Sequence, residues 1–92
     1  MVSKRLLFKK GVIDVMLYLN KVGNAGYYAL YKQGFVVSRQ TFANILKELE
    51  NLNLIRRDII ENRPPRVNYY LTEKGKRVAA LLETIDEILQ EQ

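Results

Sequence analysis

The chain has 92 residues, of which 48% are hydrophobic and 27% charged, and its formal net charge is +5. This length allows one domain with a small core, and the composition is typical of a folded globular chain. The sequence contains no histidine, cysteine or tryptophan. Their absence removes the commonest general base, thiolate nucleophiles, disulfides and cysteine-based zinc sites. We therefore expect neither an enzyme nor a metal or cofactor site.

Charge is unevenly distributed along the chain. Residues 1–77 hold all 15 lysines and arginines, whereas residues 78–92 hold four carboxylates and no basic residue. A basic body is typical of proteins that bind a polyanion such as nucleic acid, although lysine-rich faces are also simply hydrated in many small proteins. No apolar run approaches the roughly 18 residues that span a bilayer, and the N-terminal residues lack a secretion signal. We expect a cytoplasmic, nucleoid-associated protein that does not contact a membrane.

Two helices are predicted in the first third of the chain. Residues 11–23 carry apolar side chains at the i, i+3, i+4, i+7 positions of a buried helix, which Gly23 ends. These side chains are Val12, Val15, Met16 and Leu19, with Ile13 and Leu17 widening the stripe. A shorter helix is predicted over residues 26–33, with Leu30 inward and Gly34 as its stop. Its three tyrosines are expected to pack rather than to stack on bases, and they are Tyr27, Tyr28 and Tyr31.

Residues 38–52 predict an amphipathic helix with two chemically different faces. Ser38 is a good N-cap, and Val37 is placed to pack on Phe42 as a hydrophobic staple. The inward positions are Phe42, Ile45, Leu46, Leu49 and Leu52. The other face begins with side chains able to read base edges, at the end of the helix where a helix-turn-helix makes its base contacts. These side chains are Ser38, Arg39, Gln40, Thr41, Asn44 and Lys47. The alternative is a polar face that only meets water.

A hairpin with a stiff, basic tip follows this helix. Residues 55–61 are rich in β-branched side chains, and residues 66–71 alternate apolar and polar positions, as strands do. Pro64 and Pro65 cannot donate to a ladder, so we expect them at the turn, with Arg63 extended. A ribbon of this kind can reach the DNA backbone or a minor groove. The candidate contacts are Arg56, Arg57, Arg63 and Arg66.

Residues 73–90 form the last expected helix, with Thr72 as its N-cap. Apolar residues recur along it at three- and four-residue steps, as in a coiled-coil seam. They are Val78, Leu81, Leu82, Ile85, Ile88 and Leu89. Such a helix is about 27 Å long, more than a small domain covers easily. We interpret the stripe as the contact of a homodimer, and packing within one chain is the alternative.

The order helix, helix, helix, hairpin, helix resembles the winged helix-turn-helix DNA-binding proteins of the MarR, HxlR and PadR group, and small archaeal members in particular. The resemblance is carried by SRQTFANILKELENLNLIRRDIIENRPPRVNYYLTEKGKRVAALL, of which YYLTEKG is the most specific part. It implies an α+β, mainly α fold, with a DNA-binding domain over residues 1–72 and a dimerisation helix over residues 73–92. The base-reading positions that it implies are Ser38, Arg39, Gln40, Thr41 and Asn44, and the wing contacts are Arg63 and Arg66. HxlR-type sensors usually carry a reactive cysteine, so thiol sensing is not implied here.

We predict a homodimer that binds double-stranded DNA sequence-specifically and acts as a transcriptional regulator, most simply a repressor. Two alternatives stay open. One is a centromere-binding adaptor of an archaeal plasmid-partition system, which spreads along DNA and meets further protein partners. The other is a winged-helix module that binds an acidic protein. Steep salt dependence of binding to duplex DNA separates the first two functions from the third.

Overall fold

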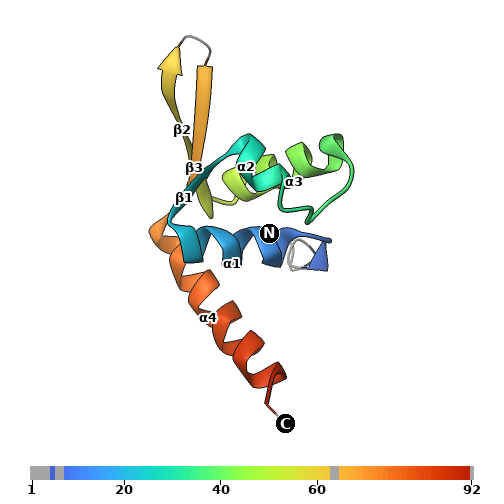
Figure 1. The fold of residues 1–92 in the computed structure, drawn as a ribbon. Helices are drawn as coiled ribbons and strands as arrows, with labels where there is room; N and C mark the ends of the chain where they lie inside the picture. The colour runs from blue at the N-terminus through green and yellow to red at the C-terminus, as the bar shows by residue number, and fades with distance from the viewer. Residues whose placement is uncertain (1–4, 6–7, 63–64, 92) are drawn as a thin grey trace.

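The computed structural model describes residues 5, 8–62 and 65–91, and its helices and hairpin have the predicted order, with one additional strand (Figure 1). They are α1 (Val12–Val22), β1 (Asn24–Gly26), α2 (Tyr27–Tyr31), α3 (Arg39–Asn51), β2 (Ile55–Asn62), β3 (Pro65–Leu71) and α4 (Glu73–Leu89). In Figure 1, α2 and α3 lie on one side of α1, and the β2–β3 hairpin projects from one end of this body. Helix α4 leads away on the opposite side. The predicted α+β, mainly α architecture with a hairpin wing is confirmed.

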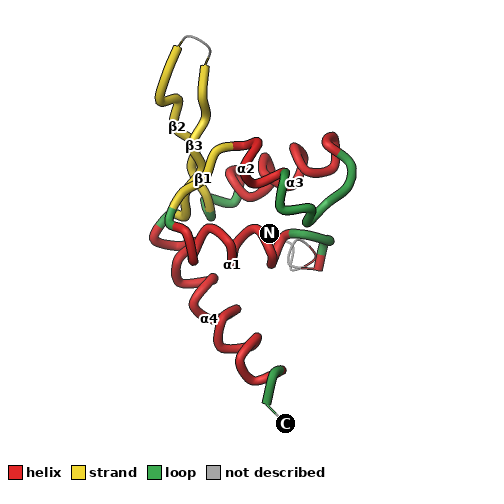
Figure 2. The backbone as a smooth tube through the Cα atoms, in the orientation of Figure 1, coloured by secondary structure: helices red, strands yellow, loops and turns green. Residues whose placement is uncertain are grey.

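The three strands form one antiparallel sheet in the order β1-β3-β2, drawn in yellow in Figure 2. The register of β2 against β3 shifts between Ile59 and Glu61, as at a β-bulge, which increases local twist. Pro65 is the first residue of β3 and pairs with Asn62, so it lies at the tip of the hairpin as predicted, but in the last pair of the ladder and not in the turn itself. Pro64 lies outside the described residues. Strand β1 was not predicted, because three residues without alternation become a strand only by pairing with β3.

The core lies where α1, α3 and the first half of α4 meet the sheet. Four of the six apolar residues predicted for the stripe of α1, Val12, Val15, Met16 and Leu19, are at most 1% exposed. Leu17 is half-buried, whereas Ile13 is 37% exposed, so its predicted place in the buried stripe is wrong. Gly11 precedes this helix and Gly23 follows it, both at positive φ (91° and 89°), which glycine adopts without strain. The predicted stop at Gly23 is therefore confirmed.

The start of α4 is joined to the turn between α3 and β2. The Thr72 hydroxyl accepts the backbone N–H of Gly75 at 2.9 Å, which confirms the predicted N-cap, and donates to the carbonyl oxygen of Asn53 at 2.6 Å. Lys74 Nζ donates to the carbonyl oxygen of Leu52 at 2.9 Å. These bonds tie the direction of α4 to the end of α3.

Two local predictions before α3 are wrong. Helix α2 is shorter than residues 26–33, since Gly26 belongs to β1 and a turn follows Tyr31. The side chain of Val37 is 84% exposed and makes no staple, whereas its neighbour Val36 is 7% exposed. The ring of Phe42 packs instead on aromatic side chains of α2, with centroid distances of 5.6 Å to Tyr27 and to Tyr31.

Candidate nucleic-acid interface

Helix α3 presents a polar face to solvent because its apolar face is held in the core. Its buried residues are Phe42, Ile45, Leu46 and Leu49, while Leu52, also predicted inward, caps the helix and is half-buried. The Ser38 hydroxyl accepts the backbone N–H of Thr41 at 3.3 Å, which confirms the predicted N-cap. All six predicted base-contact residues are exposed, and they are Ser38, Arg39, Gln40, Thr41, Asn44 and Lys47. The helix therefore brings them together on one open face.

Tyr31 of α2 supports the first residue of this face. The Cζ atom of Arg39 lies 5.3 Å from the centroid of the Tyr31 ring, a cation–π contact. The Tyr31 hydroxyl donates to the carbonyl oxygen of Val37 at 2.7 Å, which holds the segment between α2 and α3. Sequence reasoning assigned Tyr31 to packing alone, and periodicity carries no signal for a contact that crosses this turn.

The other two tyrosines of α2 differ from each other. Tyr27 is half-buried against Phe42, as predicted. Tyr28 is 64% exposed, so its predicted packing is wrong, and Lys32 Nζ lies 5.4 Å from its ring centroid.

Gln40 and Asn44 form a pair on the exposed face. Gln40 Nε2 donates to Asn44 Oδ1 at 3.1 Å, one helical turn apart. This bond leaves the Gln40 carbonyl oxygen and the Asn44 amide nitrogen to contact a ligand. Adenine presents a matching donor and acceptor, N6 and N7, in the major groove.

The wing does not present its arginines on one face. Arg57 pairs across the strands with Tyr69, and Arg56 pairs with Tyr70. Since successive residues of a strand point to opposite faces, the two arginines diverge. Arg66 of β3 is exposed and lines a groove between the wing and α2. Arg63, the fourth predicted contact, lies outside the described residues.

Arg57 is directed toward α3. Its Nε atom lies 3.6 Å from Glu50 Oε1, an ion pair between the end of the helix and the base of the wing. Arg57 therefore joins α3 to the wing, a role that sequence reasoning missed.

Tyr69, the register partner of Arg57, lies at the same contact. Burial is the main cause that raises the pKa of the Tyr69 hydroxyl above its usual value of 10.0, and the charge of Glu50 also raises it.

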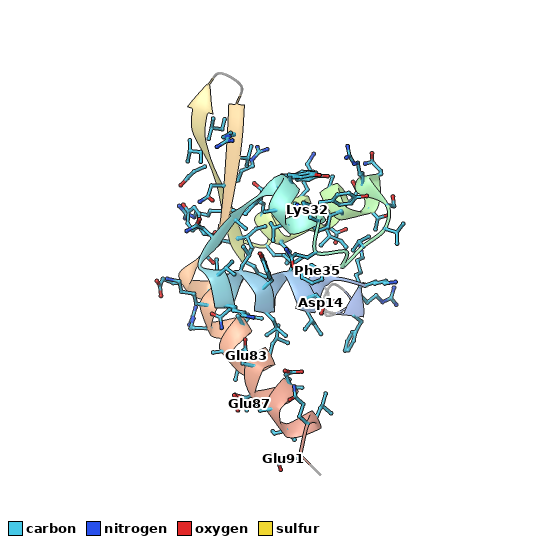
Figure 3. The ribbon with its side chains drawn as sticks, in the orientation of Figure 1. Asp14, Lys32, Phe35, Glu83, Glu87 and Glu91 are labelled. Atoms are coloured by element: carbon cyan, nitrogen blue, oxygen red, sulfur yellow. The ribbon has the colours of Figure 1, made fainter. Side chains whose placement is uncertain are left out.

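The predicted dimer stripe of α4 divides into two parts. Gly75, Ala79 and Leu82 are buried, and Val78 packs against the same core. Assigning Val78 and Leu82 to a dimer contact is therefore wrong, because this side of α4 packs on α1 within the chain. The remaining residues are exposed, and they are Leu81 (67%), Ile85 (52%), Ile88 (57%) and Leu89 (78%). Figure 3 shows Glu83 and Glu87 along the projecting part of this helix, and Glu91 just beyond its end.

Within the described residues, no group of three or more acidic, histidine or cysteine side chains is arranged to hold a metal ion. Nor does the described part of the chain contain a helix long and apolar enough to cross a bilayer.

Comparison with known proteins places these elements in a family. The model of the HxlR-like helix-turn-helix family matches residues 6–92. The chain belongs to this family. It is similar to an uncharacterized HTH-type transcriptional regulator of Methanocaldococcus jannaschii, with 37% identity over 84 residues covering 87% of this chain and 72% of that protein. A second relative of the same description, from Methanothermobacter thermautotrophicus, is 41% identical over 51 residues, which are 55% of this chain and 39% of that protein. The chain thus spans well under half the length of this second relative.

Solved structures show the same fold for this HxlR-like chain. A transcriptional regulator of the MarR family from Porphyromonas gingivalis superposes with a TM-score of 0.80 at 23% identity, over 96% of this chain and 85% of that one. The reduced form of the regulator YodB from Bacillus subtilis superposes with a TM-score of 0.72 at 24% identity, over 95% and 90% of the two chains. The winged-helix fold predicted from the sequence is confirmed.

Proposed function

We propose that this HxlR-like protein is a transcriptional regulator that reads double-stranded DNA with the N-terminal half of α3. The observation that carries the proposal is the exposed polar face of α3, set on a helix whose opposite face is buried. The names of the two archaeal relatives, both HTH-type transcriptional regulators, support it.

The residues of α3 have distinct roles in this proposal. Arg39, held at the start of the helix by Tyr31, has the fork geometry that recognises guanine. The Gln40–Asn44 pair matches adenine, and the exposed Lys47 binds a backbone phosphate further along the helix. Ser38 and Thr41 lie beside the DNA at the helix N-terminus, where hydroxyl groups contact bases or phosphates.

Arg66 and Arg63 bind the DNA backbone or a minor groove from the wing in this proposal. Arg57 has a supporting role, since its ion pair with Glu50 orients the wing relative to α3. Arg56 faces the other side of the sheet and is not part of this contact.

We further propose that the protein acts as a homodimer joined through α4. Four large apolar side chains are exposed on this helix, Leu81, Ile85, Ile88 and Leu89, and a closed two-fold dimer is the commonest way to cover such a surface. A dimer places two copies of α3 in successive major grooves, about 34–36 Å apart. A dimer bound in this way to a two-fold symmetric site of the nucleoid acts most simply as a repressor of transcription.

A DNase footprint over the DNA that surrounds the protein's own gene tests this function. We expect one bounded, two-fold symmetric protected site, and we expect Gln40→Ala to reduce this protection. Gln90→Ala is the matched control, because Gln90 also bonds an exposed side chain one turn away, Asp86, but lies at the far end of α4. Absence of protection at any protein concentration refutes DNA reading by α3. Protection that spreads from one site as protein is added contradicts a local repressor.

A further inference from the structure

A basic groove lies where the first turns of α4 meet the base of the wing. Its charged lining residues are Arg56, Glu73, Lys74, Lys76 and Arg77. Four of the five are cations, and all four cationic side chains are exposed. The Glu73 carboxylate lies 3.4 Å from Lys76 Nζ, and this one negative charge balances only one of the four positive charges of the groove.

The basic groove lies on the side of the sheet opposite to α3. Arg57 and Tyr69, which are register partners, face the helix and its Glu50. Arg56 and Tyr70 are the next pair along the strands, so they point the other way. Both line the basic groove together with the start of α4. A straight duplex that lies on α3 is therefore separated from the groove by the wing.

The lining favours a polyanion over a folded protein partner. Protein interfaces have a fully buried centre that is more apolar than the rest of the surface. The one aliphatic residue of the groove, Leu71, is only 4% exposed, so it offers no such centre. Interfaces with DNA are polar and strongly positive, and arginine and lysine are the side chains that neutralise phosphates.

We propose that the basic groove binds the phosphate backbone of a second segment of double-stranded DNA while α3 reads the first. This inference rests on the proposed DNA-binding function. It makes each protein molecule a bridge between two duplexes that lie on opposite sides of the wing.

A bead capture assay tests the bridge. A short random-sequence duplex is fixed to beads, a second fluorescent random-sequence duplex stays in solution, and both retained protein and captured fluorescence are measured. The test variant is Lys76→Gln/Arg77→Gln, and its matched control is Lys10→Gln/Lys21→Gln, which removes the same charge at exposed positions outside the groove. Circular dichroism confirms that each variant is folded.

We expect the wild type and the control to capture the second duplex. The groove variant should still be retained on the beads but should capture much less fluorescence. When capture is titrated with the second duplex, the slope of the log binding constant against log salt should also flatten by about 1.8, since each lost phosphate contact contributes roughly 0.9.

Four outcomes overturn the inference, and the last of them overturns the proposed function as well. Equal capture by the groove variant and the wild type shows that the bridge, if formed, does not use this groove. Retention of the wild type without any capture shows that no second duplex binds. A change of the groove variant from dimer to monomer in sedimentation shows that the groove binds the acidic half of α4 from a second copy. Wild-type protein that is not retained on the beads refutes the proposed DNA-binding function itself, and the bridge with it.

Discussion

Gly75→Ala tests the contact that joins α4 to the rest of the chain. Gly75 lies in the first turn of this helix, and a Cβ at this position would collide with the carbonyl oxygen of Leu54. That oxygen is backbone, and it accepts the N–H of Thr72 at 3.1 Å, so it cannot turn aside as a side chain could. The N–H of Gly75 is itself held by the Thr72 hydroxyl at 2.9 Å.

The sign of the effect is set by one favourable and two unfavourable terms. Helix propensity alone favours alanine over glycine by about 1 kcal/mol. Overpacking costs about 1–3 kcal/mol, and displacing the N-cap hydrogen bond of Thr72 costs about 1 kcal/mol more. We therefore expect Gly75→Ala to lower the free energy of unfolding by about 2 kcal/mol, which in a domain of this size lowers Tm by about 8–16 °C.

Thermal and urea unfolding followed by circular dichroism measure this loss. All variants are compared at one protein concentration, because the proposed dimer would make Tm depend on concentration. Ala80→Gly is the control: Ala80 is exposed on the same helix, so this change reports helix propensity and should cost about 1 kcal/mol. A Gly75→Ala protein as stable as the wild type, or more stable, would refute the close packing of α4 on the turn before β2.

Three further predictions concern the proposed interface, the dimer and the pH dependence. Gln40→Ala should weaken binding to the footprinted site by about 1–3 kcal/mol and relax specificity, as measured by gel-shift titration. Arg66→Ala should instead weaken binding to all DNA sequences alike and flatten the dependence of the binding constant on salt. Equal loss of affinity for specific and random DNA in the Gln40→Ala protein contradicts base reading. Ile85→Glu puts a charge into the exposed apolar part of α4 and should convert dimer to monomer in sedimentation velocity, and a variant that still sediments as a dimer shows that the interface lies elsewhere. Because burial and Glu50 raise the pKa of Tyr69, the folded state keeps this proton to higher pH than the unfolded chain, so stability falls as pH rises past 10. Tyr69→Phe should make this alkaline decline shallower in urea unfolding, and an unchanged slope would show that another group causes it.

Local patterns in the sequence were sufficient for most of the elements. The spacing of apolar residues in α1 and α3 marks the faces that are buried, because a helix repeats every 3.6 residues whatever it packs on. Ser38 and Thr72 mark helix starts, since an N-cap bonds to backbone only three residues away. Alternation of apolar and polar residues in β3 and the prolines near the turn mark the hairpin, because both effects act between neighbouring residues of the chain.

Only the tertiary structure decided which surfaces meet. β1 exists because β3 lies beside it. Leu82 is buried because α1 covers that part of α4, whereas Ile85, which belongs to the same three- and four-residue repeat of apolar positions, is exposed. Tyr31 reaches Arg39, and Glu50 reaches Arg57, across turns whose paths no periodicity describes. Short-range patterns record what a residue does within its own element. Contacts between elements depend on how the chain bends between them, and the packing of the whole core determines those bends.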